Sequence, residues 1–122
     1  MMFDNINKPK GLKRVYLATL NSLRAFNWLV KNEAAFRQEL LLLVLVIPIT
    51  FLLDITIKEQ LILIISTLFI LFTEVLNTAI ESVVDRVGLE IHPLSGLAKD
   101  LGSAAVFISL VIAVCTWVAI LL

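Results

Sequence analysis

Four polar residues interrupt one of the most apolar stretches of this chain, residues 61–86. Glu74, Asn77, Glu81 and Asp85 follow one another at spacings of three, four and four residues. On an α-helix these spacings place all four side chains on one narrow stripe. A carboxylate at membrane depth costs about 2.5–3.5 kcal/mol on insertion scales, and an ionisable group there indicates a functional site by default. The stripe is therefore the first candidate for chemistry.

Further carboxylates are expected near the Asp85 end of this stripe. Glu33 stands just before the first apolar segment and Glu90 just after the second. If the segments cross a membrane in alternate directions, these two carboxylates lie at the same level as Glu81 and Asp85. Glu74 is two helical turns deeper than Glu81, about 10 Å at 1.5 Å per residue. Mg²⁺ takes oxygen ligands and often binds one or two carboxylates together with substrate phosphates. The sequence indicates an Mg²⁺ site; taken singly, Glu33, Asp85 and Glu90 fit solvated helix-end charges equally well.

The chain lacks the motifs of several other common chemistries. It contains no GxxxxGK[ST] loop, no GxGxxG fingerprint and no GxSxG elbow, and His92 is its only histidine. A histidine-based triad or a multi-histidine metal site is therefore unsupported. Glu, Asn, Asp and Lys suit metal-assisted phosphoryl transfer, because that chemistry relies mainly on positioning and charge neutralisation. A proton relay through a membrane glutamate is the non-enzymatic alternative.

Three apolar segments predict the elements that hold these groups. Residues 104–122 are nearly uninterrupted and close to the roughly 20 residues that a bilayer core requires. Residues 60–84 carry the polar stripe. The first segment reaches span length only as residues 34–53, with its polar residues 37–39 snorkelling at the interface. We expect three transmembrane helices rather than a soluble bundle, for which too little polar covering remains.

An amphipathic segment precedes the spans, at about residues 12–32. Basic and amide side chains occupy much of the side opposite its apolar face. This pattern favours a helix that lies in the membrane interface, and an amphipathic helix packed on protein is the alternative. The apolar face consists of Leu12, Tyr16, Leu20, Leu23, Phe26 and Val30.

The distribution of basic residues predicts the orientation. Seven of the ten lysines and arginines precede or enter the first span. The connection after the first span has only Lys58. The second connection, residues 86–99, has Arg86 and Lys99, and Asp100 is expected to lie in this connection too. By the positive-inside rule the N-terminus and the second connection face the cytoplasm. The first connection and the C-terminus then face outward.

The composition agrees with an integral-membrane protein. The chain has 122 residues, of which 60% are hydrophobic, whereas soluble domains are about 45–50% apolar. The formal net charge is zero, so no global field attracts nucleic acid and we expect no such partner. The single cysteine, Cys115, cannot form an intrachain disulfide. The whole chain, residues 1–122, is expected to be one integral-membrane domain.

Three segments of the chain together resemble one family. They are NEAAFRQE at residues 32–39, EVLNTAIESVVDRVG at 74–88 and HPLSGLAKDLGSAAV at 92–106. Together they resemble the small prokaryotic diacylglycerol kinases, and the resemblance extends from about Arg14 to the end of the chain. Undecaprenol kinases of the Gram-positive branch share the second and third segments. The first segment has the diacylglycerol kinase form typical of the Gram-negative branch.

The resemblance implies a fold and an activity. The implied fold is a homotrimeric all-α bundle, with three transmembrane helices and an N-terminal amphipathic surface helix in each subunit. The implied activity is ATP-dependent phosphorylation of diacylglycerol to phosphatidic acid, with Mg²⁺ accompanying the ATP, in the bacterial inner membrane. Active sites shared between neighbouring subunits would explain how so short a chain makes a kinase. They would also give Glu74 a protein-facing environment.

The resemblance also implies roles for individual residues. Glu74 corresponds to the general base and Asn77 to its polar support, while Glu33 and Glu81 correspond to the carboxylates that hold Mg²⁺. Nucleotide contacts are implied for Arg14, Asn21, Glu33, Glu81, Glu90, His92, Lys99 and Asp100. Positions beside the lipid substrate are implied for Ala35, Phe36, Arg37, Gln38, Glu39, Glu74 and Ser103.

Three positions depart from the residues common in the family. Asn21 stands where an aromatic residue is common, Pro93 where an acidic residue is common and Leu97 where an arginine is common. These departures leave the reaction class intact and bear on nucleotide selectivity. The sequence is compatible with three functions: a diacylglycerol kinase, which the resemblance favours, a polyprenol kinase, and a non-enzymatic proton-coupled membrane protein.

Overall fold

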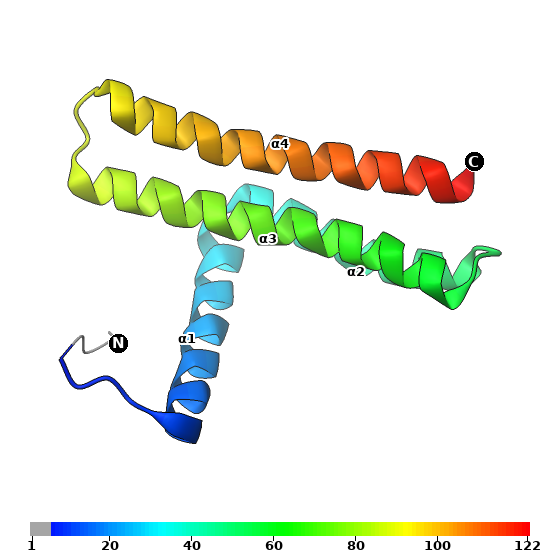
Figure 1. Cartoon of the computed structure of the whole chain (residues 1–122), viewed down its shortest axis with the longest axis horizontal. Helices are drawn as coiled ribbons and strands as arrows, with labels where there is room; N and C mark the ends of the chain where they lie inside the picture. Colours follow the sequence, from blue (N-terminus) through cyan, green and yellow to red (C-terminus); the bar gives the residue numbers. More distant parts are fainter. Residues whose placement is uncertain (1–5) are drawn as a thin grey trace. The chain divides into compact units, whose positions relative to one another are not determined.

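A computed structural model describes residues 6–122, and it divides the chain into two compact units, with the boundary between Ala34 and Ala35. The described residues form helices and their connections, without a strand. The helices are α1 (Gly11–Asn32), α2 (Ala34–Leu52), α3 (Ile57–Val87) and α4 (Pro93–Leu121), as Figure 1 shows. The predicted all-α chain with one N-terminal helix and three apolar helices is confirmed.

Helix α1 makes up most of the first unit. It begins after Lys10, and Gly11 has a φ of 65°, a value that L side chains rarely adopt. The six apolar residues predicted to share one face are all exposed, Leu12 and Tyr16 most strongly. The apolar face of α1 is therefore available to a lipid surface or to another protein surface.

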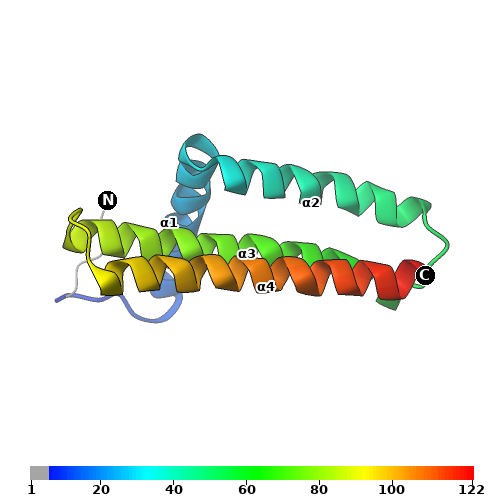
Figure 2. The same ribbon diagram turned by 90° about the horizontal axis from the view of Figure 1, so that it is seen from above.

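Helices α3 and α4 form the closely packed pair of the second unit. They run antiparallel side by side, while α2 lies farther from both (Figures 1 and 2). Within α2, no Cα atom approaches a Cα of α3 or α4 within 8 Å. A hydrogen bond from Gln60 Nε2 to Thr50 Oγ1, 3.1 Å long, links α2 to α3 near their connection. The rotational setting of α3 therefore depends mainly on its contact with α4.

Local signals define the helix ends in the second unit. Thr56 and Glu59 form a capping box at the start of α3, with the Thr56 hydroxyl accepting from the Glu59 N–H. At the start of α4, His92 Nδ1 accepts a hydrogen bond from the Leu94 N–H, and Pro93 occupies the first helical position. These signals start α4 at Pro93, eleven residues before the apolar span expected from Ala104.

This early start corrects one expectation. The sequence predicted that Lys99 and Asp100 lie in the second connection, but both are on α4. The connection consists of residues 88–92 alone. The apolar pattern shows where a span can begin, whereas the His92–Pro93 cap decides where the helix begins.

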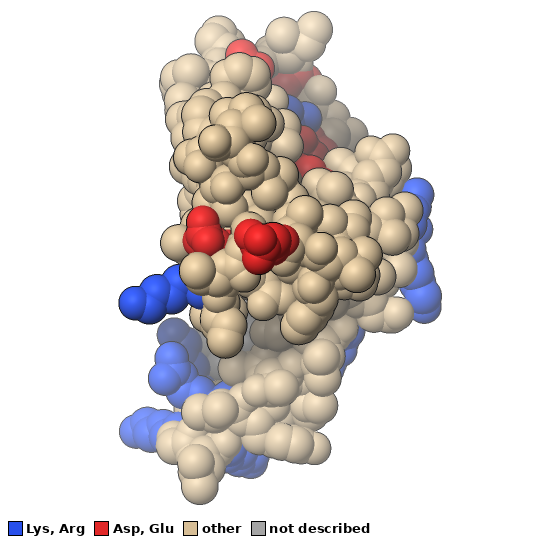
Figure 3. Space-filling view, turned by 90° about the vertical axis from the view of Figure 1, so that its right-hand side faces the viewer, with Lys and Arg blue, Asp and Glu red and all other residues tan. Residues whose placement is uncertain are grey.

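Three helices are long and apolar enough to cross a membrane: α2, α3 and α4. Most of the surface seen in Figure 3 is neither acidic nor basic, and large apolar side chains are exposed along all three helices. At 1.5 Å per residue, α3 and α4 are about 45 Å long, against a hydrocarbon core of about 30 Å. Both helices are therefore longer than the hydrocarbon core. Their apolar stretches lie within it, so the C-terminal end of α3 and the N-terminal end of α4 extend beyond it.

Small and hydroxyl-bearing residues form much of the buried contact surface of α3 and α4. Thr73 on α3 and Ser109 on α4 are buried, and so is Gly102. Such residues allow two membrane helices to approach closely. At Gly102 the approach leaves no room for a side chain, because a Cβ built there would overlap with the Asn77 amide oxygen.

We predict that Gly102→Ala destabilises the α3–α4 pair by about 1–3 kcal/mol, because the added methyl displaces Asn77 and breaks its hydrogen bond to Glu81. The measurement is the free energy of unfolding of the detergent-solubilised protein. Gly96→Ala is the matched control, since a Cβ there meets nothing within 4 Å and alanine gains about 1 kcal/mol in helix propensity. Equal effects of the two substitutions would contradict the close approach at Gly102.

Candidate functional site

The polar stripe lies on α3 and passes from a buried to an exposed environment. Glu74 is 7% exposed, Asn77 and Glu81 are partly buried, and Asp85 is exposed. The deepest member is therefore enclosed by protein within a single subunit, as its cost at membrane depth requires. The stripe leads from an enclosed carboxylate toward a polar helix end.

Asn77 and Glu81 form a hydrogen-bonded pair in the middle of the stripe. Asn77 Nδ2 donates to Glu81 Oε1 across 3.3 Å, which gives the amide a defined orientation. The Asn77 Oδ1 atom is buried without a hydrogen-bond partner and lies against Gly102. A buried acceptor without a partner is costly, and the close approach of Gly102 leaves no room for a further group beside this oxygen.

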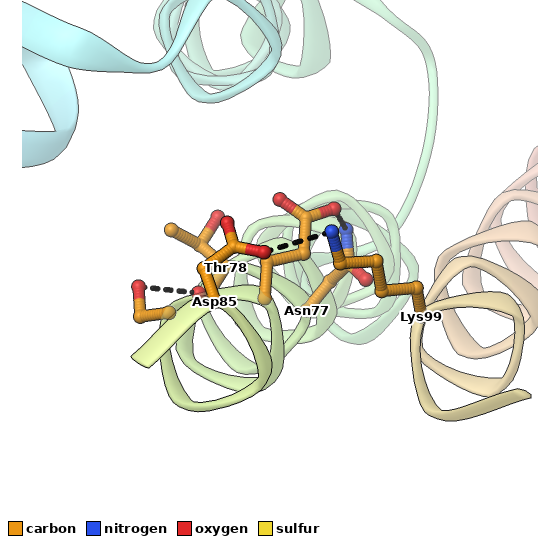
Figure 4. A network of polar contacts seen from close by, with 6 residues as sticks. Asn77, Thr78, Asp85 and Lys99 are labelled. Atoms are coloured by element: carbon orange, nitrogen blue, oxygen red, sulfur yellow. Dashed lines mark hydrogen bonds and ion pairs between the residues drawn. The ribbon is translucent and has the colours of Figure 1, made fainter. Parts of the chain in front are cut away.

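Lys99 reaches from α4 to the exposed end of the stripe. Its Nζ atom lies 2.9 Å from Asp85 Oδ1, as Figure 4 shows, and the ammonium also interacts electrostatically with Glu81. About half of each side chain of the ion pair is exposed, so the pair adds little to stability. The ammonium instead places a positive charge beside two carboxylates. Phosphate oxygens could contact the ammonium there, and a metal ion bound to the phosphates could contact the carboxylates.

A second carboxylate from α2 faces the buried end of the stripe. The Glu39 and Glu74 carboxyl groups are close enough to interact electrostatically, and Glu39 Oε2 is buried without a hydrogen-bond partner. Glu39 thus brings the predicted lipid-side segment, residues 35–39, next to the predicted base. The first two turns of α2 otherwise contain the buried Phe36 and the exposed Arg37 and Gln38.

The connection between α3 and α4 borders a shallow cavity of about 270 Å³. Several of the predicted nucleotide contacts meet in its lining, together with Asp85. His92 directs Nδ1 to the helix backbone, and this leaves Nε2 as the ring atom for a ligand. The predicted contacts in this lining are Glu90, His92 and Lys99.

Other predicted site residues lie outside this cavity. Asp100 and Ser103 are exposed on α4 and do not line it. Arg14 and Asn21 belong to α1 in the first unit, where Asn21 Oδ1 accepts from Arg24 NH1 at 3.0 Å. Glu33 ends α1, and its N–H donates to the Leu29 carbonyl. The predicted metal pair of Glu33 and Glu81 thus draws on both units and stays a prediction.

The donor set fits a magnesium ion that arrives with phosphates better than a metal held by protein alone. Among residues 6–122, no group of three or more His, Cys, Asp and Glu side chains is arranged to hold a metal. Glu81 offers a partly buried carboxylate with one oxygen oriented by Asn77. Mg²⁺ commonly uses one or two carboxylates and completes its coordination with phosphate oxygens and water.

Two features beside the stripe were missed by the sequence reasoning. Thr73 immediately precedes Glu74 and hydrogen-bonds to Ser109 on α4, and Gly102 makes room for Asn77. For Thr73, a hydroxyl within an apolar run was a visible signal, but its partner lies 36 positions away in the sequence. The pairing depends on the register of α3 against α4, which only the fold supplies.

As a whole, the stripe suits proton abstraction at its deep end and phosphate binding at its exposed end. Glu74 can accept a proton from a group that enters at membrane depth, because water has little access there. Glu81, Lys99 and the connection can contact a charged ligand from the aqueous side. One substrate, with an apolar body and a hydroxyl, would approach Glu74. A second substrate, with phosphates, would approach Glu81 and Lys99, and the two would meet between these ends of the stripe.

Comparison with known proteins identifies the family. The family model described as prokaryotic diacylglycerol kinase matches residues 20–121. A diacylglycerol kinase of Pseudomonas aeruginosa is 52% identical over 92% of this chain and 91% of its own length. Those of Haemophilus influenzae and Escherichia coli (strain K12) are 46% and 44% identical, with 93% and 94% of this chain and 97% and 94% of their own lengths covered. The resemblance carried by the three sequence segments is thereby confirmed: this chain belongs to the prokaryotic diacylglycerol kinase family.

Proposed function

We propose that this lipid kinase transfers the γ-phosphate of ATP to the free hydroxyl of diacylglycerol and produces phosphatidic acid. Membership of the family and the relatives named diacylglycerol kinase support the substrate class. The observation that carries the proposal is the enclosed Glu74 carboxylate beneath the Asn77–Glu81 pair. A proton-coupled carrier would account for Glu74 but not for the charged end of the stripe.

In the proposed step, Glu74 is the general base. The lipid hydroxyl oxygen forms a bond to the γ-phosphorus, and its proton passes to the Glu74 carboxylate. The bond between the γ-phosphorus and the bridging oxygen breaks, and ADP leaves with that electron pair. Asn77 is proposed as a polar support for the stripe, because its amide N–H donates to Glu81 Oε1 one turn beyond Glu74.

Glu33 and Glu81 are proposed to hold the Mg²⁺ of Mg-ATP. When bound, Mg²⁺ neutralises charge on the phosphate oxygens. Arg14, Asn21, Glu90, His92, Lys99 and Asp100 are proposed to contact the nucleotide. Lys99 already carries its positive charge beside Asp85 and within electrostatic reach of Glu81. This juxtaposition supports a polyphosphate site at the exposed end of the stripe.

The reaction is proposed to occur at the cytoplasmic interface of the bacterial inner membrane. Most basic residues precede the first span, which supports a cytoplasmic N-terminus by the positive-inside rule. With three spans, the connection between α3 and α4 then faces the same compartment as the N-terminus and ATP. The lipid-side residues, from Ala35 to Glu39 together with Ser103, would face the glycerol end of the substrate.

We further propose a homotrimer whose active sites are shared between neighbouring subunits. Large apolar side chains remain exposed along α2, α3 and α4, and they can contact lipid or other subunits. The predicted ligands on α1 and α3 also belong to two separate compact units. Glu33 of one subunit can therefore be proposed to meet Glu81 of a neighbouring subunit, with the internal structure of each unit unchanged.

The lipid specificity is tested directly with purified protein in mixed micelles. Radiolabelled ATP and either diacylglycerol or undecaprenol are supplied, and the labelled lipid is identified. We expect phosphatidic acid from diacylglycerol. Preferential labelling of undecaprenol would support the polyprenol kinase alternative, and labelling of neither lipid would contradict the proposal.

The first functional prediction concerns the base. Glu74→Gln keeps the size of the side chain but removes its ability to accept the hydroxyl proton, so kcat is expected to fall by about 10²–10⁴-fold. Glu59→Gln, the same change at the outer end of α3, retains an oxygen for the Thr56 N–H and serves as the control. Near-normal turnover of folded Glu74→Gln protein would refute the role of Glu74.

The second prediction concerns the metal. Glu33→Gln and Glu81→Gln are each expected to raise the Mg²⁺ concentration for half-maximal activity by at least about tenfold, since losing even an indirect metal partner typically costs 10- to 100-fold. Raising Mg²⁺ should partly restore turnover, whereas the diacylglycerol KM should change little. Asp54→Asn, in the opposite connection, is the control. An unchanged Mg²⁺ dependence in both variants would exclude the shared metal site.

The third prediction concerns the shared site. Subunits carrying Glu74→Gln and subunits carrying Glu33→Gln are mixed after dissociation, and a tag pull-down verifies that mixed oligomers form. If the two glutamates of a site come from different chains, some mixed oligomers contain a site with both groups intact. Activity should then rise above that of either parent. The absence of recovery in verified mixed oligomers would place both glutamates of each site in one chain.

A further inference from the structure

A buried pair of hydroxyl groups joins α3 to α4 one residue before Glu74. Thr73 Oγ1 donates to Ser109 Oγ across 2.9 Å, and Ser109 Oγ donates to the Val106 carbonyl at 2.6 Å. Thr73 is 6% exposed and Ser109 is 0% exposed. The Ile70 carbonyl, 2.9 Å from Thr73 Oγ1, is the alternative acceptor within α3. Because Ser109 uses its proton on its own helix, it offers Thr73 an acceptor and completes a chain of hydrogen bonds.

The position of this pair couples it to the direction of the Glu74 side chain. Consecutive residues on an α-helix project about 100° apart, so Thr73 and Glu74 turn together when α3 rotates about its axis. Thr73 faces α4, where Ser109 is, and Glu74 lies close enough to Glu39 of α2 for the two carboxyl groups to interact electrostatically. A rotation of α3 that broke the hydroxyl bond would also displace the Glu74 carboxylate.

The α2 side offers little to prevent such a rotation. No Cα atom of α2 lies within 8 Å of a Cα of α3, and the hydrogen bond between Gln60 and Thr50 is near the opposite end of α3. The Glu39 and Glu74 carboxylates repel one another when both are ionised. The close backbone packing that sets the rotation of α3 therefore comes from α4.

We propose that Thr73 and Ser109 are positioning residues for the phosphoryl-transfer step, and that their hydrogen bond sets the orientation of Glu74 toward the lipid hydroxyl. The proposal rests on the proposed role of Glu74 as base. Neither hydroxyl touches substrate; both act through the rotation of α3. Since the nucleotide groups lie at the exposed end of the stripe, the pair should affect kcat and leave the KM for Mg-ATP nearly unchanged.

The test uses Thr73→Val, Ser109→Ala and the double variant of the full-length enzyme. Each single variant is expected to lower kcat about three- to tenfold, the range that one interhelical hydrogen bond in a membrane supports. The KM for Mg-ATP should stay within about twofold of the parent value. The double variant should be no slower than the slower single variant, because the bond can be lost only once. Thr73→Ser, which restores a hydroxyl, should recover most of the lost kcat.

Thr67→Val is the matched control. Thr67 is another buried threonine of α3, but its hydroxyl donates to the Leu63 carbonyl of its own helix. Its removal should leave kcat unchanged. A similar loss of kcat in Thr67→Val would show a general effect of buried hydroxyl groups and overturn the proposal. So would multiplicative losses in the double variant, or parental kcat in Thr73→Val.

Failure of this inference can be distinguished from failure of the proposed function. Glu74→Gln and Glu74→Gln/Thr73→Val are measured in parallel. If Glu74 is the base, the second substitution should cause little further loss, since the group that the pair orients is already absent. Substantial turnover in Glu74→Gln alone would reject the base itself, whereas an inactive Glu74→Gln with a fully active Thr73→Val would reject only the positioning pair. Should Thr73→Val fail to fold, the smaller change Ser109→Ala carries the same expectations.

Discussion

The enclosure of one carboxylate is the constraint on which the rest of the structure depends. Glu74 lies in the apolar part of α3, where exposure to lipid would be costly, and the fold leaves only 7% of it exposed. One turn further along α3, small residues of α4 such as Gly102 pack closely against Asn77. The same close packing holds the Asn77 amide in one orientation above Glu74 and directs its N–H group to Glu81. The orientation of the Asn77 amide toward Glu81 thus follows from the packing of α3 against α4.

The buried hydroxyl groups of α3 and α4 also need hydrogen-bond partners within this helix pair. A polar atom in a membrane must find its partner inside the protein. The hydroxyl groups of Ser66 and Thr67 donate to the Leu63 carbonyl of their own helix, and so place no demand on α4. Thr73 and Ser109 differ because their bond crosses between the helices. In the positioning role proposed for this pair, the crossing bond sets the rotation of α3 and with it the direction of Glu74, the proposed base.

The sequence predicted the parts of the site that depend on local spacing and on cost in a membrane. The stripe from Glu74 to Asp85 follows from spacing alone, and the burial of Glu74 follows from its charge. The helical placement of Lys99 was missed, because the apolar pattern begins near Ala104 whereas the His92–Pro93 cap starts the helix. The contacts of Thr73 and Gly102 were missed for another reason. They depend on the register between two helices, and no local pattern encodes that register.

The two faces of α3 have different tasks, and this difference explains why α2 stands apart. On the α4 side, close contact and a crossing hydrogen bond make α3 rigid. On the α2 side, Glu74 and Glu39 face one another across a wider separation. If Glu74 is the base, as proposed, a lipid hydroxyl has to reach it, and a helix packed as tightly as α4 would exclude that approach. For the proposed base, orientation from the α4 side and access from the α2 side are therefore complementary requirements.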